Sequence, residues 1–522
     1  MKTTQNPSKA VAKVTDRMEP YSGAESSGRQ SGSGLILVSN RQPYEHIVRK
    51  GHRICQRTDG GLTFALDPIL TRCGGVWIAW GNGDADRSAV GPDGTTAVPP
   101  ESPAYSLRRV WLTPEEIKGG YHGYANEVLW PLCHITLDRV AYRRRYWMEY
   151  VELNRRFAES VIEELKIEQR LVWVHDFHLA LLPRFIKELQ PATSLAFFWH
   201  IPWPGIDVFR VLPEARDLLQ SLLAADSLVF QTAGYARAFA ECARFFLGAE
   251  IDEARHTVLL KGHSTHLTAQ AISVDVGTFS RQARAPQVDR MMASIRRQVG
   301  GYSGMKYGLG VDRLDYTKGL LKRFWAIDQF FSRYPEYCGR FTFVQIAIPT
   351  RKDVEAYRRY RKVIWQTVLD INDRHRSADA ELPEKWQPIL YLEERIPFDL
   401  LASYYRLADV AVVSSVNDGM NLVAKEYVAS QVDESGVLLI SQMAGAAEEL
   451  TDALIINPYD AEGVADSIRQ ALEMPIDERR RRMRAMRAYL QAHDLRAWAE
   501  ACLRDAGVSM DRLLGMEANA LG

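Results

Sequence analysis

Short apolar runs recur along the chain and alternate with segments whose apolar residues follow helical spacing. In the first half, the runs typical of buried strands are Leu35–Val38, Val76–Trp80, Leu171–Val174, Leu195–Trp199, Ser227–Gln231 and Ala269–Val276. Helical spacing follows from Val151 to Leu165, from about Leu179, and up to about Leu247. This alternation of strand and helix predicts a parallel sheet covered by helices.

The same pattern restarts near residue 306. Strands are predicted at Lys306–Val311, Phe341–Ile348, Pro388–Leu392, Asp409–Val413 and Gly436–Ile440, with a helix over Leu320–Phe331 and a helix start at Ala444–Ala447. Two such units predict an α/β protein of two Rossmann-like, doubly wound domains that face each other across a cleft.

The chain is expected to have four parts. Residues 1–34 are polar and rich in Ser and Gly, which predicts a disordered tail. The first domain spans residues 35–285 and the second 286–485, and residues 486–522 form a closing helix and tail. The dense charge run Asp477–Arg487 is interpreted as a solvated helix face.

One strand-loop-helix stretch, Asp418–Glu426, has the pattern of an anion site. The apolar run before it ends in a small-residue turn, and the helix that follows presents free backbone N–H groups and a positive dipole end, where a phosphate binds well. Asp418 and Glu426 are eight positions apart, so their carboxylates can reach two sugars on either side of one pyrophosphate. The alternative is an ordinary turn in which Asp418 is a cap and Glu426 an exposed helix residue.

Polar residues also follow three other predicted strands. Arg41 follows the first strand, Asp176 comes after the strand at Leu171–Val174, and His200 follows the next. Because ligands of open α/β sheets bind at the carboxyl ends of strands, these side chains are candidates for a cleft site. A lone histidine is more often structural, but two consecutive strands with such ends favour a functional cleft.

Two cations follow the first strand of the second half. Arg313 and Lys318 are five positions apart across a turn, so both can converge on one diphosphate. The charge on a departing nucleotide must be neutralised by a metal or by fixed cations. The alternative is a pair of solvated surface side chains.

Composition narrows the class of protein. The chain has 65 Lys plus Arg against 65 Asp plus Glu, which argues against nucleic acid or a membrane surface as a partner. No segment reaches the roughly 18 apolar residues that a spanning helix needs, and no apolar signal segment follows the N-terminus. The six cysteines are widely spaced, as in a reduced, cytoplasmic protein. The oligomeric state, a homo-oligomer included, is left open.

Together, seven motifs carry a resemblance to the trehalose-6-phosphate synthases, which are retaining sugar-nucleotide glycosyltransferases of family 20 with the two-domain GT-B fold. The resemblance runs from about Leu35 to Cys502. The motifs are Ser39–Arg41, Gly60–Leu62, Val128–Pro131, His175–His178, His200–Pro204, Val311–Gly319 and Asp418–Glu426.

The resemblance implies an acceptor site for glucose 6-phosphate. Its phosphate would be held by Arg41, Tyr121, Trp130 and Arg351, and Asp176 would accept hydrogen bonds from the sugar hydroxyls. A dianionic phosphate favours guanidinium groups and neutral donors of this kind.

The resemblance also implies a donor site for a nucleotide-glucose. Its residues would be Gly60, Gly61, Arg313, Lys318, Asn421, Leu422, Val423 and Glu426. Arg313, Lys318 and the backbone at 421–423 would hold the diphosphate, Glu426 the ribose, and Asp418 and His200 the transferred glucose. Asp176, His200, Arg313, Lys318 and Asp418 would form the catalytic set, with stabilising rather than covalent roles. No cofactor and no metal are expected, nor an Asp-x-Asp metal site.

Two features leave alternatives open. Asp275 stands where the family usually has a glycine, near the nucleotide side. The segment Ser39–Tyr44 also resembles glucosylglycerol-phosphate synthases, which use ADP-glucose and glycerol 3-phosphate, whereas Gly60 and Gly61 favour the trehalose branch. UDP-glucose is the expected donor, although the sequence leaves uridine, adenosine and guanosine open. A silent binding homologue is disfavoured by the complete set of charged cleft residues.

Overall fold

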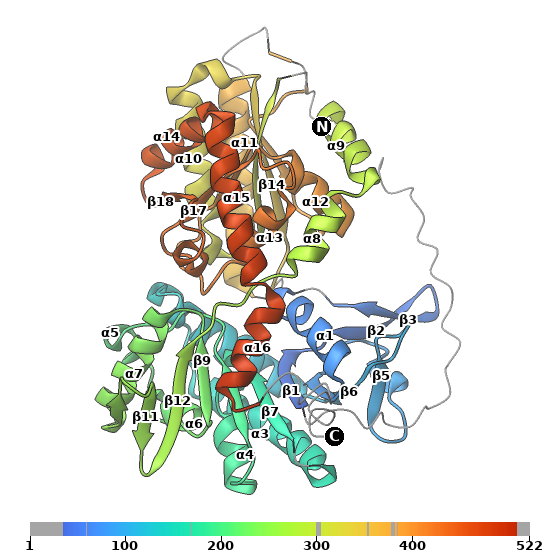
Figure 1. Cartoon of the computed structure of the whole chain (residues 1–522), viewed down its shortest axis with the longest axis vertical. Helices are drawn as coiled ribbons and strands as arrows, with labels where there is room; N and C mark the ends of the chain where they lie inside the picture. Colours follow the sequence, from blue (N-terminus) through green and yellow to red (C-terminus); the bar gives the residue numbers. More distant parts are fainter. Residues whose placement is uncertain are drawn as a thin grey trace, which may run out of the picture.

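The computed structural model describes residues 35–508, with gaps at 59, 169, 299–303, 352–353, 377–381 and 384. The predicted tail at 1–34 and the end of the chain from 509 lie outside the described residues. Two α/β bodies are stacked along the long axis of the molecule (Figure 1). The predicted fold of two facing, doubly wound units is confirmed.

The N-terminal body is built on a ten-stranded sheet of order β10-β11-β12-β9-β8-β7-β1-β4-β6-β5. Its strands are β1 (Leu35–Arg41), β4 (Val76–Trp80), β5 (Thr95–Val98), β6 (Tyr105–Val110), β7 (Leu171–His175), β8 (Leu195–Phe198), β9 (Ser227–Phe230), β10 (Glu250–Asp252), β11 (Thr257–Leu260) and β12 (His263–Ala269). The pairs from β12 through β6 are parallel, and the two edges are antiparallel. A separate hairpin, β2 (Tyr44–Arg49) and β3 (His52–Arg57), follows β1.

Helices cover both faces of this sheet. They are α1 (Gly61–Cys73), α2 (Trp130–Cys133), α3 (Arg144–Ile167), α4 (Leu182–Leu189), α5 (Ile206–Phe209), α6 (Ala215–Leu222) and α7 (Ala233–Leu247), with a π-helix over Glu116–Leu129. Short 3-10 turns lie at Asp86–Ala89, Leu137–Arg139 and Phe177–Leu179 in this body, and at Tyr316–Lys318, Pro335–Tyr337 and Gly445–Glu448 in the other.

The C-terminal body has a six-stranded, all-parallel sheet of order β15-β14-β13-β16-β17-β18. Its strands are β13 (Lys306–Arg313), β14 (Phe341–Ile348), β15 (Ile389–Leu392), β16 (Val410–Val413), β17 (Val437–Ser441) and β18 (Leu454–Ile456). Its helices are α8 (Val276–Ala283), α9 (Pro286–Gln298), α10 (Leu320–Arg333), α11 (Glu355–Arg376), α12 (Phe398–Leu407), α13 (Leu422–Ser430), α14 (Ala461–Glu473) and α15 (Ile476–Ala492). By their contacts, α8 and α9 pack against α12 and α13. The predicted domain limits stay a prediction.

The last helix, α16 (Leu495–Asp505), leaves the C-terminal body and lies on the N-terminal one (Figure 1). The ring of Trp498 lies 5.6 Å from that of Trp173 and 5.3 Å from that of Phe198. The chain therefore crosses between the bodies twice, once before α8 and once before α16.

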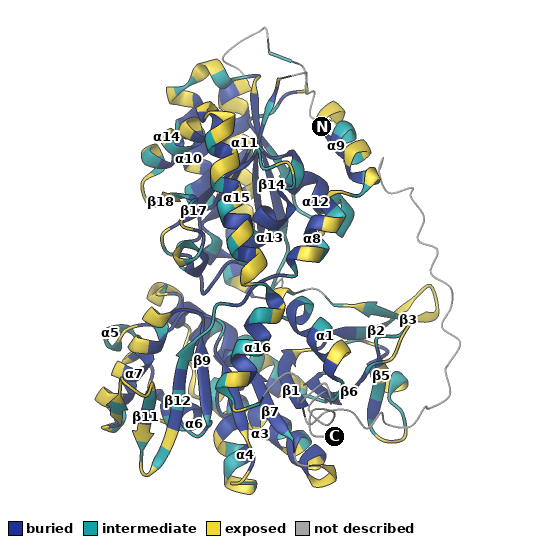
Figure 2. Cartoon of the chain, viewed as in Figure 1, coloured by how far each residue is buried: buried dark blue, intermediate teal, exposed yellow. Residues whose placement is uncertain are grey.

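Apolar strands form the buried centre of each body, and exposed residues gather on the outer faces of the helices (Figure 2). β1, β7 and β8 are buried almost throughout, as expected for parallel strands covered on both faces. No helix among the described residues is both long enough and apolar enough to span a membrane.

Two sequence-based predictions about elements are wrong. The strand expected at Ala269–Val276 ends at Ala269, because the segment after it runs as a loop into Asp275, which caps α8. The charge run Asp477–Arg487 is only partly a solvated face, since Arg479 and Arg487 are each 6% exposed. Both donate hydrogen bonds to backbone carbonyls, Arg479 to Leu472 and Arg487 to Ala429, which compensates the burial of their charge.

Candidate functional site

The carboxyl ends of the two parallel sheets meet between the bodies. Arg41 ends β1, Asp176 follows β7 and His200 follows β8, whereas Arg313 ends β13, Arg351 follows β14 and Asp418 follows β16. Because each strand ends at the same edge of its sheet, six side chains from distant parts of the sequence reach one cleft. Direct contacts described below join the two sets.

Trp130 carries two guanidinium groups from the opposite body. The guanidinium carbon of Arg351 lies 4.2 Å from the centre of the Trp130 ring, and that of Arg313 lies 5.3 Å from it. Trp130 itself is buried, so these cation–π contacts hold both arginines beside one ring between the bodies.

The guanidinium groups of Arg41, Arg313 and Arg351 lie close enough in the cleft to repel one another. Burial and the neighbouring charges of Arg351 and Arg41 lower the pKa of Arg313. Among the described residues, no carboxylate forms an ion pair with Arg313. Cations held together against their own repulsion define a site that an anion would stabilise.

Arg351 is positioned by groups of its own body. Its Nη1 lies 2.9 Å from Oδ2 of Asp315, and it also contacts the Tyr357 hydroxyl. The same Oδ2 accepts a hydrogen bond of 3.0 Å from that hydroxyl. Asp315 is fully buried, so this pair holds the guanidinium at the mouth of the cleft.

Tyr121 lies on the π-helix Glu116–Leu129, and π-helical geometry is frequent at functional sites. Its ring stacks on that of His178 at 5.6 Å and contacts that of Trp80 at 5.2 Å. The helix thus places Tyr121 beside the end of β7, whereas Trp130 follows the same helix directly. The joint role of Tyr121 and Trp130 at an acceptor phosphate stays a prediction.

Asp176 occupies a strained backbone position, with a φ of 78° that non-glycine residues rarely adopt. Its Oδ1 accepts a hydrogen bond from the Phe177 N–H, and its Oδ2 lies 3.5 Å from Nδ1 of His178. Burial raises the pKa of Asp176, but the hydrogen bond and charge of His178 outweigh this and lower it. Asp176 is therefore an ionised acceptor at neutral pH.

His200 is a neutral imidazole in a defined tautomer. The Gln231 side-chain oxygen accepts from the Ile272 N–H, so its Nε2 donates to Nδ1 of His200 at 3.2 Å. Nε2 of His200 then carries the hydrogen and donates to Nδ1 of His175 at 3.0 Å. Burial lowers the pKa of His200 to about 4 against the pull of Asp176. Both ring nitrogens are thus engaged within the protein.

Lys318 and Asp418 form an ion pair at the loop after β16. Nζ of Lys318 lies 2.5 Å from Oδ2 of Asp418, which also accepts from Ser415 Oγ and Asn421 Nδ2, each at 3.0 Å. Burial raises the pKa of Asp418, but the Lys318 charge and the hydrogen bonds lower it overall. The carboxylate is ionised and rigidly placed.

The predicted helix after this loop is α13, and it begins at Leu422. Asn421 is its N-cap in the left-handed conformation, with a φ of 77°, and its side-chain oxygen accepts from the Ala424 N–H. The cap satisfies one N–H of the first turn, and the N–H groups at Leu422 and Val423 belong to that same turn. Asn421, not Asp418, is therefore the cap.

Glycines bring the two bodies together at this loop. A Cβ on Gly419 would lie 2.3 Å from the His200 carbonyl oxygen, and one on Gly61 would lie 2.7 Å from Leu422 Cδ1. Gly419 therefore allows a backbone approach that any side chain would block. Gly61 starts α1 directly opposite the start of α13, and Gly60 precedes it as N-cap.

Glu426 lies one turn further along α13. Its Oε2 accepts a hydrogen bond of 2.6 Å from the Tyr405 hydroxyl. Burial raises the pKa of Glu426, and the Tyr405 hydrogen bond opposes this. Glu426 is therefore not the exposed helix residue of the alternative interpretation.

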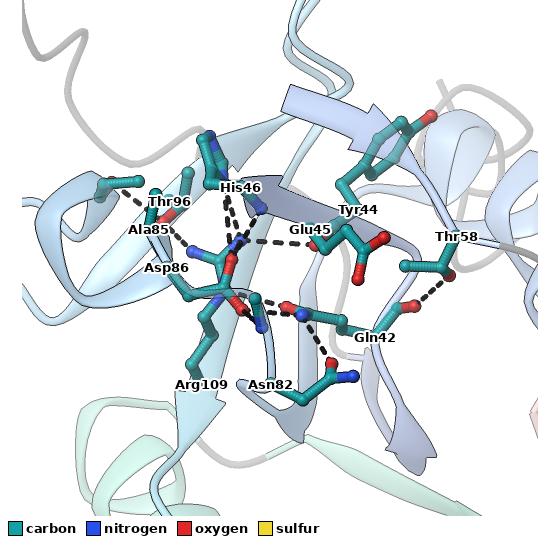
Figure 3. Close-up of polar contacts among 12 residues, drawn as sticks. Gln42, Tyr44, Glu45, His46, Thr58, Asn82, Ala85, Asp86, Thr96 and Arg109 are labelled. Atoms are coloured by element: carbon teal, nitrogen blue, oxygen red, sulfur yellow. Dashed lines mark hydrogen bonds and ion pairs between the residues drawn. The ribbon is translucent and has the colours of Figure 1, made fainter. Parts of the chain in front are cut away.

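A buried network behind Arg41 was not predicted (Figure 3). Asp86 and Arg109 are paired at 3.3 Å with no exposed side-chain surface. Nε2 of Gln42 donates to Asp86, and Arg109 donates to Oε1 of Gln42 at 2.8 Å and to the Tyr44 carbonyl at 3.3 Å. The network fixes the turn that follows Arg41. Its members are scattered over some 70 sequence positions, and the only signal of it in the sequence is the pair of arginines, Arg108 and Arg109, in the otherwise largely apolar segment of β6.

The chain contains one Asp-x-Asp sequence, Asp84-Ala85-Asp86, and the expectation that the protein has no Asp-x-Asp metal site stays a prediction. Asp86 is engaged in the network just described, and Asp84 accepts a hydrogen bond from the Val48 N–H.

Asp275, which stands where the family usually has a glycine, also has a structural role. Asp275 caps α8 through the Thr278 N–H and hydroxyl, at 2.9 Å and 2.6 Å.

The fold and the cleft define the class of protein, a two-domain glycosyltransferase of the GT-B type. The model of glycosyltransferase family 20 matches residues 33–507, and the chain belongs to that family. The resemblance found in the sequence is confirmed.

Similar proteins cover nearly the whole chain. A trehalose-6-phosphate synthase from Mycolicibacterium vanbaalenii is 37% identical over 95% of this chain and 100% of its own. The structure of a UDP-forming alpha,alpha-trehalose-phosphate synthase from Burkholderia xenovorans in complex with glucose-6-phosphate has a TM-score of 0.80 at 31% identity, covering 92% of this chain and 100% of that one. An E. coli structure bound with UDP-2-fluoro glucose has a TM-score of 0.79 at 30% identity, over 90% and 98%.

Proposed function

We propose that this protein transfers glucose from UDP-glucose to glucose 6-phosphate, with retention, to give α,α-trehalose 6-phosphate and UDP. The observation that carries the proposal is the set of cations that both bodies bring to one cleft. Arg313 and Arg351 lie on the Trp130 ring, and Lys318 lies beside Asp418. Two substrates that each carry phosphate would neutralise this charge. The proposal is supported by the similar trehalose-6-phosphate synthases, whose structures contain glucose-6-phosphate or UDP-2-fluoro glucose.

On the acceptor side, Arg41, Tyr121, Trp130 and Arg351 would hold the phosphate. Arg351 can offer it a guanidinium fork, because Asp315 binds one edge and leaves the group oriented. Asp176 is ionised and lies at the end of β7, where it would accept from hydroxyls of the acceptor sugar. The network of Asp86 and Arg109 holds the turn after Arg41 and acts as a positioning element.

On the donor side, Arg313, Lys318 and the N–H groups at the start of α13 would bind the diphosphate. Lys318 would exchange part of its contact with Asp418 for a phosphate oxygen, and Asp418 would then accept from the glucose hydroxyls. Glu426 would accept from the ribose. Gly60 and Gly61 leave room for the phosphates opposite Leu422.

The reaction would proceed on one face of the glucose. The bond between C1 and the diphosphate oxygen breaks, and its electron pair leaves with UDP, whose growing charge the cations stabilise. The anomeric hydroxyl oxygen of glucose 6-phosphate bonds to C1 from the same face. Its proton passes to the departing phosphate oxygen, which balances the step without a protein base. Retention follows because departure and attack share a face.

His200 fits this scheme as a neutral neighbour of the transferred glucose. Its tautomer is set by Gln231, and its Nε2 hydrogen is directed to His175. A neutral imidazole avoids adding repulsion to the developing positive charge at C1. The cytoplasmic location stays a prediction, and the oligomeric state stays open. All six cysteines lie in the described part of the chain, and none of them forms a disulfide there.

The test is a matrix of nucleotide release from UDP-, ADP- and GDP-glucose, each with glucose 6-phosphate or glycerol 3-phosphate, in metal-free buffer. Release from UDP-glucose that depends on glucose 6-phosphate is the expected result. Release only with glycerol 3-phosphate would move the protein to the glucosylglycerol-phosphate branch, which the segment Ser39–Tyr44 also resembles. A matched control is Arg358→Ala, an exposed arginine on α11, which should leave the whole matrix unchanged.

A further inference from the structure

A second cavity lies between the bodies, beside the site described above. It has a volume of about 400 Å³ and is lined from β9, β12, the turn at Gly445–Glu448, α15 and α16. We call it the hinge cavity, because α15 and α16 join the bodies there. Its lining includes none of the residues assigned to the donor or acceptor. The volume lies within the roughly 300–1,000 Å³ typical of small-molecule sites.

A tight backbone contact runs between the hinge cavity and the cleft. Gly445 lines the cavity, and a Cβ on it would lie 2.2 Å from the Gly419 carbonyl oxygen, while Gly419 in turn abuts the His200 carbonyl. Gln231 also lines the cavity and binds His200 through its side chain. The cavity is therefore separate from the transferred glucose but shares a wall with its site.

The polar groups of the lining are suited to hydroxyl groups. The side-chain N–H of Gln270 donates to Oδ2 of Asp505 at 3.0 Å, which orients the amide and leaves its oxygen as an acceptor. Gln270 and Glu448 add acceptor oxygens to the same lining, and Tyr489 stacks on His493 at 4.2 Å to form an aromatic wall.

The charges of the lining argue against an ionic ligand. None of the lining residues is lysine or arginine, so a phosphate would have no cation to bind. Of the two carboxylates, Glu449 is already paired with Lys425 at 2.5 Å and accepts from the Tyr489 hydroxyl at 2.9 Å. The described residues contain no group of three His, Cys, Asp or Glu side chains placed to hold a metal ion.

We propose that the hinge cavity is a binding site for a small neutral polyhydroxylated molecule, a sugar or a polyol. Its hydroxyls would donate to Gln270 and Glu448, and its carbon face would lie on the Tyr489 and Trp498 rings. Because the lining combines both bodies, the bound molecule would contact the two at once.

The experiment measures binding of D-glucose, sorbitol and sucrose to the full chain by saturation-transfer NMR and calorimetry. UDP and glucose 6-phosphate are present at saturating concentration, so that the probes cannot bind in the cleft. If the proposed function is wrong, these two ligands themselves will not bind, and this is measured separately. Ala501 lines the cavity, and Ala501→Trp would fill it. Glu448→Ala removes an acceptor of the lining and leaves the packing of Trp498 on Trp173 and Phe198 in place.

At least one probe should bind the unmodified protein. Its affinity should fall at least tenfold in Ala501→Trp and by about fivefold in Glu448→Ala, the worth of one hydrogen bond. Ala254→Trp, in the exposed turn before β11, is the matched control and should leave the affinity unchanged. Absence of binding by all three probes, or an affinity unchanged in Glu448→Ala or in a folded Ala501→Trp, would overturn the proposal.

Discussion

Nζ of Lys318 lies 2.5 Å from Oδ2 of Asp418, and this pair connects the turn after β13 with the loop after β16. Both side chains are mostly buried, at 13% and 11% exposure. Each side chain neutralises the other until a diphosphate binds. In the proposed complex, Lys318 would then contact the diphosphate and Asp418 the glucose hydroxyls. Mutating each residue in turn can therefore distinguish the two roles.

Lys318→Met should weaken UDP binding and lower kcat/KM by about 10²–10³-fold, because a fixed cation for the departing diphosphate is lost. Asp418→Asn should bind UDP at least as tightly as the unmodified protein, because Lys318 is released from its partner, yet transfer should fall by a similar factor. Calorimetric titration with UDP distinguishes the two. Equal weakening of UDP binding in both variants would contradict the separate roles.

Arg351→Lys keeps a charge beside Asp315 but loses the guanidinium fork. The KM for glucose 6-phosphate should rise by about 10–100-fold, and the KM for UDP-glucose should stay within about twofold. Steady-state kinetics with each substrate varied in turn gives both values. A rise in the donor KM alone would remove Arg351 from the acceptor site. Arg358→Lys, paired on the surface with Glu355, serves as the control.

Gly419→Ala should abolish most activity, because its Cβ would lie 2.3 Å from the His200 carbonyl oxygen and push the bodies apart. Gly205→Ala is the matched control, since nothing lies within 4 Å of its added Cβ. Small-angle scattering should show a more open molecule for Gly419→Ala only. A variant with full activity would mean that the close contact of the two bodies is not required for transfer.

Acid should destabilise the protein from pH 6.5 downward. Burial lowers the pKa of His200 and of His134 to about 4, so the unfolded chain binds more protons than the folded one between pH 6.5 and 4. The free energy of unfolding therefore falls as pH falls through this window, by up to about 3 kcal/mol for each histidine. Urea titrations at several pH values measure it. His200→Gln should reduce the slope, and an unchanged slope would mean that His200 is charged in the folded state.

The network behind Arg41 should be important for stability. Arg109→Met leaves Asp86 buried without its cation, which should cost about 3–5 kcal/mol of the free energy of unfolding. Arg155→Ala, which breaks an exposed pair with Glu152, should cost less than about 1 kcal/mol. Denaturation in urea compares the two. A small loss in Arg109→Met would mean that the turn after Arg41 is held by other contacts.

The sequence predicts the fold well because the parallel strands are continuous apolar runs. β14 and β4 begin and end where the pattern predicts. The strands β10 and β11 at one end of the sheet are not predicted, because they are short, contain polar residues and pair in antiparallel fashion. At the cleft, residues that follow strand ends, such as Arg313 and Asp418, could be named in advance, since the end of a parallel strand fixes their place.

Contacts between side chains could not be predicted in the same way. Nothing in the spacing of Lys318 and Asp418, which are 100 positions apart, reveals that they touch. The tautomer of His200 depends on Gln231 and Ile272, which come from two other segments. The charge run of α15 predicts solvated arginines. The burial of Arg479 and Arg487 could not be predicted, because the backbone carbonyls that accept from them belong to other segments.

Glucose transfer with retention to glucose 6-phosphate is tested by the NMR spectrum of the product formed from UDP-glucose and glucose 6-phosphate. The product should be a non-reducing disaccharide phosphate with the α configuration at both anomeric carbons, formed together with one UDP for each product molecule. A β linkage at the transferred glucose, or free glucose in place of a disaccharide, would rule out this reaction.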